Sequence, residues 1–256
     1  MHYQVPDLRF RCFNKIQDVS TVPFTVNDVI QIPSVYNLET YGSVINELEI
    51  ANDNANGKLI VPWHKRNHLV VNDRRQWKQE CPVITNIIDE ISYYFNVDIN
   101  SSRVNIFRSG ENGQCGQSDS KPFHHDRSAT NPGLSQNITI GVSLGSEREI
   151  AFKHVKRKRE PDDTWHNIRS GAIVSTVCGS GSVYAFARDV NCEFQHGVLP
   201  AHGTIGNDNS YDRVSLIIWG TTRYRMDTGD SRVSKRDIPT HYELGVSERR
   251  NQSFES

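Results

Sequence analysis

Hydrophobic positions divide the chain into a helical part and, after it, a part made of short strands. Apolar side chains recur at helical spacing over residues 35–48, where Ser34 is expected to cap the helix. They do so again over 82–95, with Pro82 in the first turn, where proline is well tolerated. From about residue 104, short apolar segments alternate with Gly, Ser, Asn and Pro, a pattern typical of strands. Eight such segments follow one another: 104–107, 123–126, 138–144, 150–155, 173–177, 183–186, 193–198 and 214–219.

This order of elements predicts the fold class. Two helices followed by eight short strands are typical of an α+β protein, mainly β, whose core is a double-stranded β-helix: a jelly roll of the cupin type with an N-terminal helical layer. We therefore divide the chain into an N-terminal α/β extension with a candidate substrate lid (1–98), a jelly-roll core (99–224) and a polar C-terminal tail (225–256). Two polar segments, 110–121 and 156–170, are expected to be insertions that interrupt the barrel.

The composition is that of a globular protein outside the secretory and membrane classes. Of the 256 residues, 36% are hydrophobic and 23% are charged, and no apolar run is long enough to cross a bilayer. Met1 is not followed by a basic and then apolar leader. The 5 cysteines are an odd number without a Cys-x-x-Cys pair, which argues against a disulfide framework and a zinc knuckle. We expect an intracellular, soluble protein of the cytoplasm or nucleus, without a membrane partner.

Two histidines and an aspartate are the first candidates for chemistry. In a strand, alternate side chains share a face, so His124 and Asp126 would point the same way while His125 points outward. A third ligand, His196, lies in a second predicted strand. Two imidazoles and one carboxylate can hold one face of a non-haem iron(II) and leave the other face open. The same set could hold zinc with a bound water as nucleophile, so a hydrolase is the alternative.

Arg213 distinguishes the two metals. A guanidinium on the last predicted strand can bind the far carboxylate of a dicarboxylate such as 2-oxoglutarate through two parallel hydrogen bonds. Ser215 shares its strand face and can donate a second hydrogen bond to that carboxylate. Taken by itself, Arg213 is more simply explained by a surface salt bridge with Asp212. Together with the three metal ligands, it favours iron(II) with 2-oxoglutarate.

Six motifs then follow one another in an order that defines a resemblance. They are Arg-Val-Asn-Ile-Phe-Arg-Ser-Gly at 103–110, Phe-His-His-Asp at 123–126, Val-Ser-Leu-Gly-Ser at 142–146 with Phe152, Gly-Ser-Val-Tyr-Ala-Phe at 181–186, Gln-His-Gly-Val-Leu-Pro at 195–200 and Arg-Val-Ser-Leu-Ile-Ile at 213–218. On these motifs, the segment 82–220 resembles the Fe(II)/2-oxoglutarate dioxygenases, and within them the AlkB-like branch. The metal motif and the arginine strand are the specific parts of the match.

The resemblance implies a site and its cofactors. By position, His124, Asp126 and His196 are the catalytic iron ligands. Arg213 is then the partner of the distal 2-oxoglutarate carboxylate, and Asn105 is a further contact to this co-substrate. The cofactors implied are Fe(II), 2-oxoglutarate and O2, and the reaction couples decarboxylation of 2-oxoglutarate to hydroxylation of a substrate C–H bond.

Two residues depart from the family's pattern. Phe107 stands where the family often has a tyrosine, so one hydroxyl donor to the co-substrate is missing. Trp219 stands where the family usually has a second arginine, and Ile217 where it often has threonine. Because Arg213 and Ser215 remain, the change at Trp219 bears on the substrate side more than on iron or 2-oxoglutarate.

The substrate is less well indicated than the cofactors. AlkB-like proteins typically act on methylated nucleic-acid bases, so the resemblance implies a methylated nucleic acid as candidate partner and oxidative N-demethylation as outcome. A basic run at 156–159, and Trp63 among basic residues with His68, could contact phosphates and an extruded base. The net charge of −1, from 29 basic and 30 acidic residues, provides no general attraction for a polyanion.

Two other functions stay open. A hydroxylase of a small molecule or of a protein side chain would use the polar loop 110–121 as a lid over the iron. A cupin-like module that binds a ligand without turnover is disfavoured, because all three metal ligands and Arg213 occur together. No pattern in the sequence indicates an oligomeric state.

Overall fold

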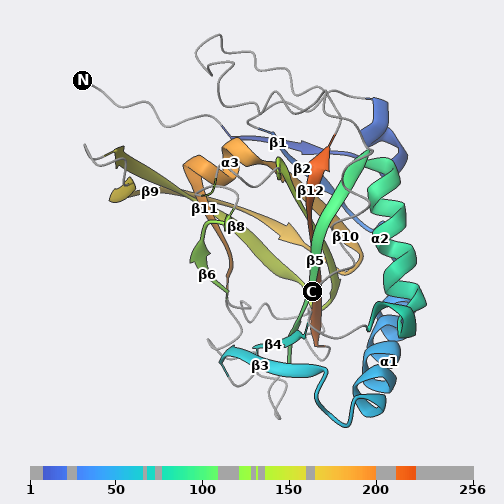
Figure 1. Cartoon of the computed structure of the whole chain (residues 1–256). Coiled ribbons are helices and arrows are strands. Elements are labelled where there is room, and N and C mark those ends of the chain that lie inside the picture. The colour runs from blue at the N-terminus through green and yellow to red at the C-terminus, as the bar shows by residue number, and fades with distance from the viewer. Residues whose placement is uncertain are drawn as a thin grey trace, which may run out of the picture.

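The computed structural model is built around two facing β-sheets, with two helices on the outer side of the larger one (Figure 1). It describes residues 8–21, 28–65, 68–72, 77–108, 121–127, 131, 136–159, 165–199 and 212–222. The larger sheet has the strand order β1-β2-β10-β7-β12-β5-β4-β3, and the smaller one β6-β11-β8-β9.

The eight strands from β5 to β12 form a jelly roll. Four of them build the middle of the larger sheet: β5 (Val97–Phe107), β7 (Ile138–Gly145), β10 (Ser182–Ala187) and β12 (Arg213–Thr222). The other four build the smaller sheet: β6 (Lys121–His124), β8 (Arg148–Arg159), β9 (Trp165–Cys178) and β11 (Phe194–Val198). Because the chain passes back and forth between the two sheets, these eight strands do not pair with their sequence neighbours among the eight, except in the β8–β9 hairpin. The predicted fold class is confirmed.

Strands from the N-terminal part lengthen the larger sheet at both edges. At one edge, β2 (Asp28–Ile32) pairs with β10, and β1 (Arg9–Cys12) pairs with β2. At the other edge, β4 (His68–Val71) pairs with β5, and β3 (Ile60–Lys65) pairs with β4. Of two short 3-10 helices, Ile16–Thr21 lies between β1 and β2, and Lys78–Glu80 lies between β4 and the helix that follows it. The residues before the core therefore share its sheet as well as covering it.

Both predicted helices are present. The helix α2 (Pro82–Tyr94) begins with proline in its first turn and buries Ile84, Ile87, Ile88 and Ile91. The helix α1 (Leu38–Asn54) starts later than expected, because its cap is Asn37, whose side chain accepts a hydrogen bond from the Thr40 backbone N–H at 2.9 Å. Ser34 instead takes a positive φ of 55° in the turn before the helix, so the prediction that Ser34 caps it was wrong.

Alternation along β12 separates the core from the inner face of the barrel. Val214, Leu216 and Ile218 pack with the buried side chains of α1 and α2 in the main hydrophobic cluster. The intervening residues, Arg213 and Ser215 among them, face the smaller sheet, and the hydrophobic cluster on that side is smaller. The helical layer thus supplies the main core, and the space between the sheets is left for polar side chains.

One further expectation did not hold, and one element was not predicted. The segment 156–170 is not an irregular insertion: β8 and β9 continue as a paired ladder as far as Arg159 and Trp165. A short helix, α3 (Arg188–Glu193), lies between β10 and β11, where six residues were too few to show a helical period.

Most of the predicted loop 110–121 and all of the predicted tail 225–256 lie outside the described residues. Within the described part of the chain, no helix combines the length and the apolar character needed to cross a membrane.

The helical layer should carry much of the stability. Ile91 is 0% exposed beneath α2, so Ile91→Ala should lower the free energy of unfolding by about 2–5 kcal/mol through lost burial and the cavity left behind. Tyr93 on the same helix is 78% exposed, so Tyr93→Ala should change it by less than about 0.5 kcal/mol. Urea unfolding followed by circular dichroism measures both. Equal losses would contradict this packing.

Candidate metal centre

Three side chains predicted from the sequence meet between β6 and β11. The two strands are antiparallel, and His196 of β11 lies opposite His124 of β6, with ring centroids 4.4 Å apart. Asp126 reaches the same point: its Oδ1 lies 3.8 Å from His124 Nε2, and its Oδ2 lies 3.7 Å from His196 Nε2. One ligand atom from each of the three residues lies within 4.8 Å of the others, a spacing that a single metal ion could bridge.

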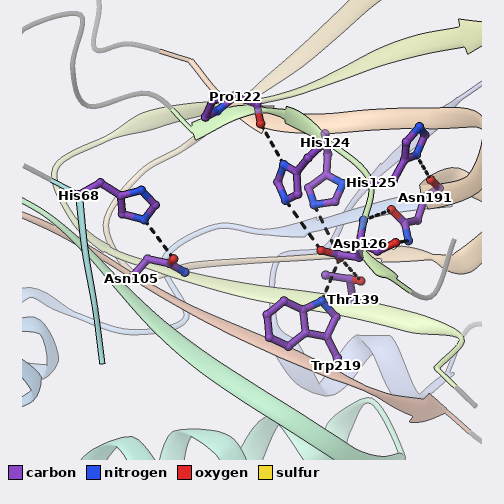
Figure 2. A network of polar contacts seen from close by, with 10 residues as sticks. His68, Asn105, Pro122, His124, His125, Asp126, Thr139, Asn191 and Trp219 are labelled. Carbon is purple, nitrogen blue, oxygen red and sulfur yellow. Dashed lines mark hydrogen bonds and ion pairs between the residues drawn. The ribbon is translucent and has the colours of Figure 1, made fainter. Parts of the chain in front are cut away.

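Asp126 is not brought there by strand alternation. The strand β6 ends at His124, so the predicted strand over 123–126 is too long. The turn that follows is held by α3: the Asp126 backbone N–H donates to Asn191 Oδ1 at 2.9 Å, and His125 Nδ1 donates to the Asn191 carbonyl at 2.6 Å (Figure 2). His125 is half-buried against α3 rather than an outward strand residue. The unpredicted helix therefore positions a predicted ligand.

Both imidazoles are prepared for a metal. His124 Nδ1 donates to the Pro122 carbonyl at 2.9 Å, which leaves the Nε2 lone pair toward the cluster (Figure 2). His124 Nε2 is buried without a hydrogen-bond partner among the described residues. Burial lowers the pKa of His196 to about 3 and also lowers the pKa of His124, so both rings are neutral at pH 7, as metal ligands must be. The donor set thus fits a divalent metal such as iron(II).

The carboxylate of Asp126 is oriented by two donors. Trp219 Nε1 donates to Oδ2 at 2.9 Å and the Thr139 hydroxyl donates to the same oxygen at 3.0 Å (Figure 2). Burial raises the pKa of Asp126, but the nearby His196 and the Trp219 hydrogen bond lower it by more, so the pKa lies below its ordinary value. Because both donors bind Oδ2, Oδ1 is left for a metal. The departure at Trp219 therefore places an indole N–H on a candidate ligand, which the sequence did not reveal.

Arg213 is a buried cation in the adjoining pocket. It is 0% exposed, its Nε donates to the Ser143 hydroxyl at 3.2 Å, and its guanidinium lies 5.3 Å from the centre of the Phe107 ring. Its Nη1 and Nη2 are buried and have no hydrogen-bond partner among the described residues. The alternative of a surface salt bridge with Asp212 does not hold, because Asp212 pairs with Arg108 at 2.7 Å. A buried guanidinium with two open donors requires an anion.

Asn105 and Ser215 line the same pocket as Arg213 and the cluster. His68 Nε2 donates to Asn105 Oδ1 at 3.2 Å, and the Asn105 amide lies 3.5 Å from the Ser215 carbonyl. His68 is 1% exposed and stacks on Phe107 with ring centroids 4.5 Å apart, so it faces the site and not the solvent. This corrects the expectation that His68 belongs to a basic outer surface.

Two further residues line the pocket that the sequence did not single out, Lys121 and Tyr184. Lys121 begins β6, and burial lowers the pKa of its ammonium group. Tyr184 is 4% exposed in the middle of β10. Tyr184 lies within a motif of the resemblance, at a position to which no role was given, and the lysine lies three residues before His124. Only the pairing register of the strands shows that Lys121 and Tyr184 face the pocket of the metal-binding side chains.

Comparisons with known proteins find only remote likenesses. No protein-family model and no curated protein matches the sequence. A solved structure of a Pseudomonas putida prolyl-4-hydroxylase is 12% identical, covers 81% of this chain and 97% of its own, and has a TM-score of 0.38. The structure of OsALKBH1 is 14% identical, covers 75% of this chain and 97% of its own, and has a TM-score of 0.45. The class of protein is therefore defined by the strand topology and by the cluster of side chains: this is a jelly-roll protein with a His-Asp-His triad.

The indole N–H of Trp219 should contribute to metal affinity. Trp219→Phe keeps an aromatic ring and removes the donor to Asp126 Oδ2, so cobalt(II) affinity should fall about tenfold or more. Titration with cobalt(II), followed by its visible absorption, measures this. Trp63→Phe is the matched control, since the Trp63 ring lies against Arg103 and is 48% exposed, and its affinity should equal that of the unmodified protein. Unchanged affinity in Trp219→Phe would contradict a positioning role.

Proposed function

We propose that this protein is an Fe(II)- and 2-oxoglutarate-dependent dioxygenase. The proposal is carried by one observation: two members of a His-Asp-His triad, Asp126 and His196, line the same pocket of a jelly roll as a fully buried guanidinium with two open donors. The triad by itself would also suit zinc. A hydrolase with the same triad has no need of a buried cation beside the metal, whereas a dicarboxylate co-substrate does.

Each residue then has a defined role. His124, Asp126 and His196 hold the iron on one face, and Arg213 binds the distal carboxylate of 2-oxoglutarate. Asn105 and Ser215 lie on the same wall of the pocket. Iron(II), 2-oxoglutarate and O2 together supply an oxidation in which decarboxylation to succinate is coupled to hydroxylation of a substrate C–H bond.

The pocket also has an apolar wall. Ile150, Val198 and Ile217 line it together with the polar residues. Such a wall excludes water, which strengthens the electrostatic interaction between Arg213 and a bound carboxylate. The same exclusion protects the oxidising chemistry from side reactions.

Anaerobic reconstitution tests the proposal. Adding iron(II) and then 2-oxoglutarate should produce the weak visible charge-transfer band of the ternary complex, and admitting air should release succinate. His196→Ala removes one of the three ligands and should abolish both signals. Absence of both from the unmodified protein would refute the dioxygenase assignment.

A second pair of variants separates metal binding from co-substrate binding. Arg213→Met should keep cobalt(II) affinity and lose the 2-oxoglutarate band, because the cation contacts none of the three ligands through a hydrogen bond. Arg108→Met is the matched control: Arg108 is partly exposed and pairs with Asp212, so both signals should persist. A band of normal strength in Arg213→Met would assign the carboxylate to another residue.

For the substrate, we propose an N-methyl group on a nucleic-acid base. Hydroxylation of such a methyl gives a hemiaminal, which releases formaldehyde and leaves the demethylated base. Support comes from Trp63, which is 48% exposed and lies 5.0 Å from the Arg103 guanidinium, itself 5.9 Å from the Trp219 ring. An exposed indole on which a base can stack is thus linked through two side chains to Asp126. The side chains of the basic run at 156–159 lie outside the described residues.

Methylated oligonucleotides test the substrate. Formaldehyde release should be seen with one or more methylated bases, and Trp63→Ala should lower kcat/KM about tenfold through lost stacking while uncoupled succinate release is unchanged. Tyr93→Ala, an exposed aromatic on α2, is the control and should retain full activity. Binding should weaken as salt rises from low to moderate concentration. Succinate without formaldehyde from any oligonucleotide would point instead to a small molecule or a protein side chain as substrate.

A further inference from the structure

Few polar groups in the pocket remain available to a ligand. Ser143 accepts the Arg213 Nε–H, and Asn105 accepts from His68 and directs its amide toward the Ser215 carbonyl. Phe107, whose ring lies against the Arg213 guanidinium, offers no hydroxyl. Among the described residues on the floor of the larger sheet, this leaves the two outer nitrogens of Arg213, the second amide N–H of Asn105 and the hydroxyl groups of Ser215 and Tyr184.

The Tyr184 ring lies across β7 toward Arg213. Tyr184 of β10 is the register partner of Gly141 in β7, and Gly141 is in turn the partner of Ile217 in β12. A methyl group added at Gly141 would collide with the end of the Tyr184 ring and with its hydroxyl oxygen. The glycine therefore provides the space in which the phenol crosses its neighbouring strand. Its hydroxyl arrives beside Ser215, with which it forms a hydrogen bond.

The two paired hydroxyls of Tyr184 and Ser215 leave one proton to donate. Burial raises the pKa of Tyr184, so the phenol is protonated at neutral pH. A hydroxyl has one proton and can also accept. If the Ser215 proton is donated to Tyr184, the Tyr184 proton is free for an acceptor in the pocket.

We propose that Tyr184, seated over Gly141, donates a hydrogen bond to the distal carboxylate of the co-substrate beside Arg213, and that Ser215 acts through Tyr184. The inference rests on the proposed use of 2-oxoglutarate and adds a binding residue to it. A carboxylate between Arg213 and the phenol would accept from both outer nitrogens of the guanidinium and from the phenol. The strand β10, which carries none of the predicted ligands, then forms part of the co-substrate site.

The test compares two keto acids on the iron(II)-loaded full chain, by anaerobic titration of the visible band. In Tyr184→Phe, the affinity for 2-oxoglutarate should fall about ten- to a hundredfold, the effect of losing a hydrogen bond to a charged group. The affinity for 2-oxobutanoate, which has the same keto-acid end but no distal carboxylate, should stay within about twofold. Tyr93→Phe, on the outer side of α2, is the matched control and should bind both keto acids normally.

The ratio of the affinities for 2-oxoglutarate and 2-oxobutanoate does not depend on the fraction of the variant that is folded. A variant that is partly unfolded loses binding of both keto acids alike, so a change in the ratio reports the distal contact alone. Gly141→Ala, which should push the phenol aside while keeping its hydroxyl, is expected to lower the same ratio. An unchanged ratio in both variants would overturn the inference. Failure of the unmodified protein to bind either keto acid would instead overturn the proposed function.

Discussion

The alternation of side chains along the larger sheet is the constraint on which the rest of the structure depends. In β12, residues that differ by one position face opposite environments: Val214, Leu216 and Ile218 enter the helix-covered core, while Arg213 and Ser215 enter the pocket. The neighbouring strands obey the same rule, so that Val104 and Ile106 of β5 are core while Asn105 lies in the pocket. A register slip of one residue would exchange the two sets and bury the arginine among the helices. The apolar outer face therefore determines which side chains can reach the metal cluster.

The polar interior has a cost that the helical core must offset. Taking the guanidinium of Arg213 out of water costs several kcal/mol, and neither of its outer nitrogens has a partner among the described residues. His196 is likewise buried in neutral form beside the Asp126 carboxylate, and His124 is neutral and partly buried there. A bound cation and a bound anion would stabilise such groups, which would couple ligand binding to folding at this site. Rigid placement of the same groups also lowers the entropy lost when the ligands bind.

Sequence patterns could predict the residues whose chemistry is distinctive, and not those whose role depends on register. His124, Asp126, His196 and Arg213 were identifiable because few functions require two imidazoles, a carboxylate and a guanidinium on strands of one barrel. Tyr184 and Trp219 have ordinary packing roles in most strands, and only the pairing of β10, β7 and β12 shows where their polar atoms lie. The hydrogen bond from the Asp126 backbone N–H to Asn191 depends on α3, and this helix is too short for its apolar residues to show a helical period in the sequence. The ladder over 156–159 was missed because a charged run has no alternation of apolar residues to reveal a strand.

Trp219 shows how one residue can bear on the metal and the substrate side at once. An arginine at this position would bring a second positive charge to the Asp126 carboxylate, whereas the indole supplies a hydrogen bond of 2.9 Å without a charge. The cation is instead Arg103, which lies 5.9 Å from the Trp219 ring and 5.0 Å from Trp63. A neutral donor leaves more negative charge on the carboxylate, which favours a divalent ion. The Arg103 cation lies beside the exposed indole of Trp63. A ligand that stacks on Trp63 would therefore lie beside the positive charge of Arg103. This charge favours an anionic backbone or an electron-rich ring. Because Arg103 lies outside the metal centre, it does not reduce the negative charge that Asp126 offers to a metal.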